Sequence, residues 1–174
     1  MSFLTPENLV KELYLKEGSL VADIGCGSGA YTMPLSRAVG EVGQVYALDI
    51  NREMVHSLNL MLEKNSIKNV EVVWADIEKD AQIEHYSLDA VVLSNVLFQL
   101  ENIDKALENI TKILKPEGEL LIVDWSASHG NIGPTEAHVV KEEKAEQLVK
   151  KYGFRIVKRL PAGKYHYAFV ALCV

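Results

Sequence analysis

An acid and three closely spaced glycines, Asp23, Gly25, Gly27 and Gly29, stand together in the stretch VADIGCGSGAYT near the start of the chain. Glycine lets the backbone turn tightly and approach a ligand without a side-chain clash, and the free amides of a following helix can hold a polar group. Gly25, Gly27 and Ala30 also fit the GxGxx(G/A) pattern of dinucleotide-binding proteins. A carboxylate at Asp23, however, would repel a pyrophosphate and favour a cationic group. The stretch therefore predicts a nucleotide-like ligand and leaves its identity open.

Other polar residues follow the ends of predicted strands: Asp49, Asp76, and Ser94 with Asn95. In an open α/β sheet, ligands bind outside the carboxyl ends of the strands. We therefore expect these side chains to lie along the same edge as the glycine turn. Asp49 stands 20 residues after Gly29, where a carboxylate can accept hydrogen bonds from both hydroxyls of a ribose.

Apolar runs and helical patterns alternate along the chain, which predicts an α/β fold with a mainly parallel sheet. Apolar residues three and four positions apart from Ile103 to Leu114 give the clearest amphipathic helix. Further helices are expected from Thr5, over 31–39, after Asn51 and up to Gly153, and strands over 19–24, 44–49, 70–74, 88–94, 119–125, 154–160 and 165–174. Only PAGK joins the last two strands, so they must pair antiparallel.

Length and charge set limits on the class of protein. The 174 residues predict a single domain, residues 1–174. No apolar run approaches the roughly 20 residues of a membrane span, and the first residues do not resemble a secretory signal, so we expect a soluble, cytoplasmic protein. The net charge of -6 argues against a nucleic-acid partner. Cys26 and Cys173 fit a reducing compartment, and no His or Cys spacing predicts a metal site.

Several segments in order resemble the class I methyltransferases that use S-adenosylmethionine, close to the ubiquinone/menaquinone-biosynthesis type (methyltransferase type 11-like). The segments are VADIGCGSG, the acids of ALD and WAD, LDAVVLSNVLFQL and LKPEGELLIVDW, and they run from about residue 19 to 125. The resemblance implies a three-layer Rossmann-like methyltransferase fold, with a seven-stranded, mostly parallel sheet and an antiparallel C-terminal strand pair. It also implies methyl transfer from S-adenosylmethionine, which leaves S-adenosylhomocysteine, to an unidentified small-molecule acceptor.

The resemblance assigns roles to individual positions. Asp23 and the three glycines match the loop that holds the methionine portion of the cofactor, and Asp49 matches the acid that binds the ribose. Asp76 matches the residue that faces the adenine amino group, while Ile77 could pack on the adenine face and Asn95 lies between donor and acceptor. The complete set of expected cofactor-binding residues is Asp23, Gly25, Cys26, Gly27, Gly29, Asp49, Ile50, Asp76, Ile77 and Asn95.

The catalytic residue is left open, because the methyl donor supplies most of the electrophilic power and a general base is optional. His129 and His138 flank the loop after the fifth strand, which should overhang the pocket, and Tyr31 follows the glycine turn. These three are the candidates for a base, although both histidines could simply be solvated loop residues. The wider set of acceptor-side candidates adds Asn95, Phe98, Gln99, Trp125, Tyr165 and His166.

Two alternatives remain open: a non-catalytic module that binds S-adenosylmethionine or S-adenosylhomocysteine, and an NAD(P)-dependent oxidoreductase. The short segment before the first strand motivates the module, because it leaves few residues to cover an acceptor. That cover would have to come from residues 1–17, from the 126–139 loop, or from the second subunit of a homodimer.

Overall fold

Strands and helices alternate along residues 5–130 and 132–174, the part of the chain that the computed structural model describes. The strands are β1 (Leu20–Ile24), β2 (Gln44–Asp49), β3 (Val70–Trp74), β4 (Leu88–Ser94), β5 (Leu114–Trp125), β6 (Phe154–Leu160) and β7 (His166–Cys173). The helices are α1 (Pro6–Val10), α2 (Thr32–Val39), α3 (Arg52–Lys64), α4 (Ile103–Ile113) and α5 (Glu142–Lys151), with one 3-10 turn, η1 (Leu97–Gln99).

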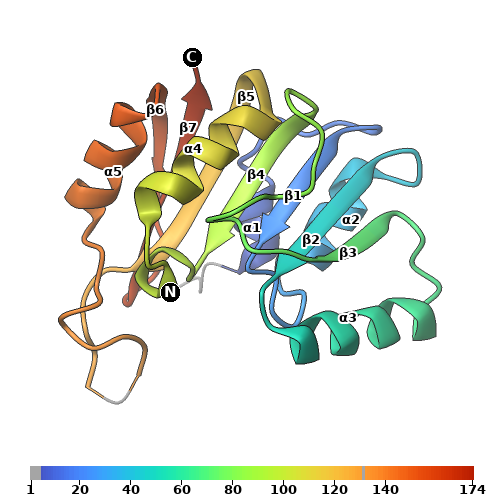
Figure 1. Cartoon of the computed structure of the whole chain (residues 1–174), viewed down its shortest axis with the longest axis horizontal. Coiled ribbons are helices and arrows are strands. Elements are labelled where there is room, and N and C mark those ends of the chain that lie inside the picture. The colour runs from blue at the N-terminus through green and yellow to red at the C-terminus, as the bar shows by residue number, and fades with distance from the viewer. Residues whose placement is uncertain (1–4, 131) are drawn as a thin grey trace.

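The strands form a seven-stranded sheet in the order β3-β2-β1-β4-β5-β7-β6 (Figure 1). The first five strands pair in parallel, and β7 lies antiparallel between β5 and β6. The predicted α/β fold, the mostly parallel sheet and the antiparallel C-terminal pair are confirmed. The strand order reverses between β1 and β4, which is where open α/β sheets bind their ligands.

Helices cover both faces of the sheet and make the fold three-layered (Figure 1). On one face, apolar side chains of α1 and α2 pack on the sheet, and α3 packs beside them on β2 and β3. On the other face, α4 and α5 pack on the strands from β1 to β7. Because both faces are covered, the central strands are apolar almost throughout, and in β4 every residue except Asp89 and Ser94 is buried.

The amphipathic helix predicted from Ile103 is α4, and its boundaries have local causes. Asn102 caps its start by accepting a hydrogen bond from the Lys105 amide at 3.0 Å. The helix ends at Ile113, because proline at 116 disfavours helical backbone in the residue before it. The backbone is already extended at Leu114, so β5 begins there and not at residue 119 as the sequence predicted.

Antiparallel pairing places the start of β7 at the carboxyl edge of the sheet. Trp125, the last residue of β5, pairs with His166, the first residue of β7. Residues at the beginning of β7 therefore join those at the ends of the parallel strands. Among the described residues, none of the helices is long and apolar enough to span a membrane.

Candidate functional site

Two cavities lie along the carboxyl edge of the parallel strands. The larger, of about 870 Å³, lies over the ends of β1, β2 and β4, at the reversal of strand order. The smaller, of about 350 Å³, lies between the glycine turn, α1 and the start of β7. Gly25, Gly27, Ser94 and Asn95 line both cavities. A ligand in the larger cavity can therefore reach the smaller one beside these four residues.

The three glycines of the turn have different tasks. Gly25 has a φ of +73°, and a Cβ atom there would lie 2.4 Å from Cγ2 of Val96. Gly27 has a φ of +50°, and a Cβ atom would meet no other atom within 4 Å, so this part of the turn is open to a ligand. Gly29 instead is buried against Leu58 of α3 and lines neither cavity. Two glycines shape the site, and the third allows helix packing.

Asp49 ties the glycine turn to the start of α3. Its Oδ2 atom accepts a hydrogen bond from the Gly27 amide at 2.9 Å, and its Oδ1 atom accepts one from the Asn51 amide at 2.8 Å. The carboxylate also lines the larger cavity. Each carboxylate oxygen can accept more than one hydrogen bond, so Asp49 can still receive the hydroxyls of a ribose.

Asp23 is a buried acid at the wall of the smaller cavity, with only 2% of its surface exposed. Its Oδ2 atom accepts a hydrogen bond from the Thr32 hydroxyl at 2.6 Å. Burial raises the pKa of Asp23 from 3.8 to about 6, against the opposing effect of the Thr32 hydrogen bonds. At neutral pH this group is mostly ionised and presents a negative charge that suits a cationic ligand group.

Asp76 and Ile77 lie at the far wall of the larger cavity. The Asp76 carboxylate accepts a hydrogen bond from the Glu78 amide at 3.0 Å and pairs with the Lys79 ammonium at 3.1 Å. Ile77 is 5% exposed and offers an apolar wall. An acid beside an apolar wall can hold a flat, hydrogen-bonding ring such as adenine.

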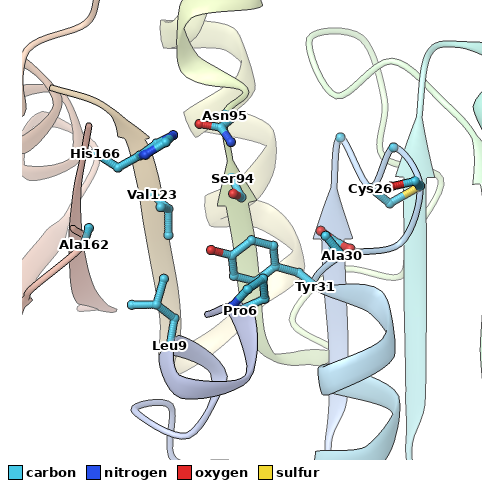
Figure 2. A pocket seen from close by; sticks show the side chains of 14 residues that line it. Pro6, Leu9, Cys26, Ala30, Tyr31, Ser94, Asn95, Val123, Ala162 and His166 are labelled. Carbon is cyan, nitrogen blue, oxygen red and sulfur yellow. The ribbon is translucent and has the colours of Figure 1, made fainter. Parts of the chain in front are cut away.

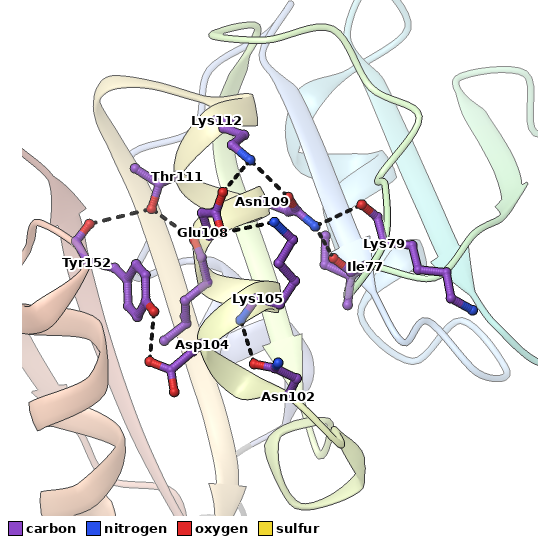
Figure 3. A network of polar contacts seen from close by, with 11 residues as sticks. Ile77, Lys79, Asn102, Asp104, Lys105, Glu108, Asn109, Thr111, Lys112 and Tyr152 are labelled. Carbon is purple, nitrogen blue, oxygen red and sulfur yellow. Dashed lines mark hydrogen bonds and ion pairs between the residues drawn. The ribbon is translucent and has the colours of Figure 1, made fainter.

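A buried amide on α4 holds this wall in place. The Nδ2 atom of Asn109 donates to the Ile77 carbonyl at 2.8 Å and to the Lys79 carbonyl at 3.2 Å. Its Oδ1 atom accepts from the Lys112 ammonium at 3.3 Å. Figure 3 shows these bonds crossing from the helix to the segment that follows β3. Because this segment has no secondary structure of its own, α4 fixes its position.

The larger cavity carries an excess of negative charge. Asp49, Asp76, Glu78 and Glu101 line it, and Lys79 is the basic residue among its described lining residues. A pyrophosphate would meet these carboxylates, whereas ribose hydroxyls and an adenine amino group can donate to them. The charge pattern disfavours a dinucleotide here.

Asn95 separates the two cavities and adopts a left-handed backbone, with a φ of +58°. Its amide donates to the Val123 carbonyl at 2.8 Å, and its carbonyl accepts from the Gln99 side chain at 2.7 Å. Its side-chain Oδ1 atom is buried and has no hydrogen-bond partner among the described residues. Strained backbone and an unsatisfied polar atom commonly coincide with ligand sites.

Asp124 fixes the turn that follows Asn95. It is fully buried. Its Oδ2 atom accepts a hydrogen bond at 2.9 Å from the amide of Leu97, which is the first residue of η1. Burial raises the pKa of Asp124 to about 6, although several backbone amides of this turn oppose the shift. The carboxylate of a residue on β5 thereby holds the part of the chain that closes the larger cavity.

The smaller cavity is mostly apolar, with Pro6 and Leu9 of α1 on one side and Val123 of β5 on another (Figure 2). The imidazole of His166 enters it from the start of β7, and its Nε2 atom is buried without a hydrogen-bond partner in the described structure. Burial, with the neighbouring His129, lowers the pKa of His166 below its ordinary value. The Trp125 ring packs on this imidazole, with 4.4 Å between ring centroids.

Of the three residues predicted as candidates for a general base, one lines a cavity and two do not. Tyr31 lines the smaller cavity, and burial raises the pKa of its hydroxyl. His129 lines neither cavity and packs on Tyr165, with 4.8 Å between ring centroids. His138 is exposed and its Nδ1 atom shares a hydrogen bond with the Thr135 hydroxyl at 2.8 Å. None of the described residues of the 126–139 loop lines either cavity, contrary to the expectation from the sequence.

The predicted cofactor residues mostly gather at the two cavities. The larger is lined by Gly25, Gly27, Asp49, Ile50, Asp76, Ile77 and Asn95, and the smaller also by Asp23 and Cys26. Burial raises the pKa of the Cys26 thiol, so this residue packs and does not react. Of the residues expected to cover the acceptor, Pro6 and Leu9 line the smaller cavity, and residues 1–4 lie outside the described part of the chain.

Sequence reasoning missed Asn109, and it named His166 only within the wider set of acceptor-side candidates. His166 begins an antiparallel strand, so a search for polar residues after strand ends passes over it. The alternation of the YHY segment was the available signal, because Tyr167 faces the α4 side of the sheet and His166 must face the other way. Asn109 is the single polar side chain buried on α4, in an otherwise apolar face.

The strand order, the open glycine turn and the acidic larger cavity define a class I α/β protein that binds an adenosyl cofactor. Comparison with known proteins agrees with this class. The chain belongs to the methyltransferase domain family, whose profile matches residues 15–164. It thus falls among the S-adenosylmethionine-dependent methyltransferases, as the sequence predicted.

Two similar proteins show how far the likeness in sequence and in structure extends. A solved S-adenosylmethionine-dependent methyltransferase from Aquifex aeolicus is 32% identical, with a TM-score of 0.91 over 99% of this chain and 91% of that one. The ubiquinone/menaquinone biosynthesis C-methyltransferase UbiE of Haemophilus ducreyi is 34% identical over 64% of this chain. That match covers 43% of the UbiE protein, so the chain spans less than half the length of the curated relatives it matches.

The fold alone does not specify the reaction. The [4+2]-cyclase SpnF is 15% identical, with a TM-score of 0.83 over 96% of this chain and 78% of that one. A likeness at this level concerns the fold, and the reaction must be argued from the site.

Proposed function

We propose that the chain transfers a methyl group from S-adenosylmethionine to a small organic acceptor. The observation that carries the proposal is the junction of the two cavities at Gly25, Gly27, Ser94 and Asn95. One cavity suits the adenosyl portion of the cofactor, and the second offers room for an acceptor beside it. When bound, S-adenosylmethionine supplies a methyl group on a positively charged sulfur.

The residues of the chain bind and orient the two ligands in this proposal. Asp49 holds the ribose, Asp76 and Ile77 hold the adenine, and Asp23 attracts the amino group of the methionine portion. Asn95 lies at the point where the donor meets the acceptor. Correct relative orientation lowers the barrier by several kcal/mol, and the apolar walls of the smaller cavity exclude water.

A place in a reducing compartment such as the cytoplasm is part of the proposal. Cys26 and Cys173 are both buried, free thiols. Persisting free thiols are typical of proteins that work under reducing conditions.

Calorimetry with S-adenosylhomocysteine, NAD and NADP tests the cofactor, and turnover with a panel of small hydroxylated, amino and thiol compounds tests the reaction. We expect binding of S-adenosylhomocysteine alone and one methylated product detected by mass spectrometry. Binding of NAD or NADP without S-adenosylhomocysteine would favour an oxidoreductase. Cofactor binding without any product would favour a non-catalytic binding module.

A further inference from the structure

Two buried polar atoms with unused hydrogen-bonding capacity belong to residues that line the smaller cavity. They are Nε2 of His166 and Oδ1 of Asn95, and neither has a partner among the described residues. Figure 2 shows the imidazole and the amide oxygen pointing toward one another from β7 and from the end of β4. A buried polar atom left unpaired costs roughly 1 to 3 kcal/mol. A ligand group that can both donate and accept a hydrogen bond would satisfy both atoms.

The charge of the smaller cavity restricts the chemistry of that group. Its described lining contains no Lys or Arg, and its one carboxyl group belongs to Asp23. Because Asp23 is assigned to the amino group of the cofactor, the described lining offers the carboxylate or phosphate of an acceptor no cationic side chain. An uncharged hydroxyl needs no such partner, and it can donate one hydrogen bond and accept others.

The size and the walls of the cavity restrict the rest of the molecule. A dry engineered cavity of about 150 Å³ can bind benzene. The present cavity, of about 350 Å³, must also admit part of the cofactor. Its walls at Pro6, Leu9 and Val123 are apolar. One substituted ring fits this space and these walls.

We propose that the methyl acceptor is a small, uncharged, largely apolar molecule with a hydroxyl group, and that Nε2 of His166 takes the proton of that hydroxyl during methyl transfer. This inference rests on the proposed function. The oxygen–hydrogen bond breaks as the oxygen–methyl bond forms, the electron pair of the methyl–sulfur bond stays on sulfur, and the proton remains on His166 until it passes to water.

The surroundings of His166 suit a proton acceptor. Its lowered pKa keeps the imidazole neutral at neutral pH, so a nitrogen lone pair is available. The Trp125 ring on one side restrains the orientation of the imidazole. A positioned general base of this kind contributes typically 100-fold to 10,000-fold to a rate.

Binding of two matched one-ring probes tests the acceptor class. Para-cresol and para-toluate differ only in the group that would receive the methyl. Calorimetry on the complex with S-adenosylhomocysteine should detect para-cresol and give no heat with para-toluate. Release of S-adenosylhomocysteine from S-adenosylmethionine should depend on para-cresol.

Two variants test the residue. His166→Gln keeps a similar size but cannot take the proton, and we expect the para-cresol rate to fall at least 100-fold while the affinity for S-adenosylhomocysteine is unchanged. His85→Gln is the matched control, since His85 is exposed in the loop before β4, at the opposite edge of the sheet. Ala162→Phe, at the rim of the smaller cavity, should weaken para-cresol binding with cofactor binding intact.

The outcomes separate this inference from the proposed function. If S-adenosylhomocysteine binds but para-cresol does not, or para-toluate binds as well as para-cresol, the acceptor class is wrong. A para-cresol rate in folded His166→Gln equal to that of the wild type would overturn the role of His166. Failure of the wild type to bind S-adenosylhomocysteine would overturn the proposed function itself.

Discussion

Asp49 combines two tasks in one side chain, because it holds the amide of Gly27 and also lines the larger cavity. We predict that Asp49→Ala weakens binding of S-adenosylhomocysteine by about 1 to 3 kcal/mol, through loss of hydrogen bonds to a charged acceptor. Calorimetry measures the effect. The matched control is Asp80→Ala, an exposed carboxylate outside both cavities, which should leave the affinity unchanged. Equal affinity of folded Asp49→Ala and wild type would remove the ribose assignment.

Asp23 should make cofactor binding depend on pH. Its pKa of about 6 means that the carboxyl group is neutral below this pH and charged above it. The charged form attracts the amino group of S-adenosylhomocysteine, so we predict an affinity that rises about tenfold as the pH increases through 6. Calorimetry between pH 5 and pH 7.5 is the measurement.

Asp124, near the larger cavity, also has a pKa of about 6, so a variant is needed to assign the pH dependence of cofactor binding to Asp23. Asp23→Asn should abolish most of the rise while Asp124 remains in place. An unchanged slope in Asp23→Asn would contradict the assignment to Asp23.

At the scale of elements, the site depends on loops that are held in place by side chains of a neighbouring helix or strand. The segment after β3 is held by Asn109 of α4 (Figure 3). The turn after β4 is held by Asp124 of β5. Two loops that line the larger cavity are therefore each fixed by a buried polar side chain, one from a packed helix and one from the sheet.

We predict that Asn109→Leu lowers both the free energy of unfolding and the affinity for S-adenosylhomocysteine. Leucine has a similar size but leaves the carbonyls of Ile77 and Lys79 without their donor, at a cost of about 1 to 3 kcal/mol for unpaired groups. Urea unfolding and calorimetry measure the two effects. Lys105→Met on the same helix removes a surface ion pair with Glu108 and should change stability by less than about 1 kcal/mol. A stable Asn109→Leu variant with normal affinity would exclude this positioning role.

At the scale of the whole molecule, two buried acids should make stability fall as the pH rises. Asp23 and Asp124 have a pKa of about 6 in the folded chain, above the ordinary value of 3.8. The folded state therefore binds more protons than the unfolded state between pH 3.8 and about pH 6. The contribution of the two acids to the free energy of unfolding is complete below about pH 4 and is lost as the pH rises to about 6. The loss is on the order of 3 kcal/mol for each group.

Urea unfolding between pH 4 and pH 7 checks this dependence, with Asp23→Asn as the comparison. We expect the wild-type free energy of unfolding to decrease over this window and the variant to show about half of the decrease. A free energy that increases steadily from pH 4 to pH 6 would contradict the raised pKa values.

Much of this architecture follows from local sequence. The spacing of Ile103, Leu107 and Ile110 determines α4, because a stripe of apolar side chains must be buried on one face of a helix. The glycine turn and the acid at Asp49 predict a nucleotide-like ligand, because a close approach to backbone needs glycine and a ribose needs an acceptor. The short PAGK connection requires an antiparallel pair. Each of these conclusions needs only a few neighbouring residues.

Only the tertiary structure decided what depends on contacts between distant segments. The register of β5 on β4, the packing of Gly29 against Leu58 and the two bonds of Asn109 arise from pairing and packing that no local pattern specifies. Strand order also brings His166 to the end of β5, some 40 residues earlier in the chain, and no described residue of the 126–139 loop lines either cavity. The sequence by itself determined the fold class and the donor chemistry, whereas the folded sheet selected the residues that line the smaller cavity, because an antiparallel strand begins at the edge where its parallel neighbours end.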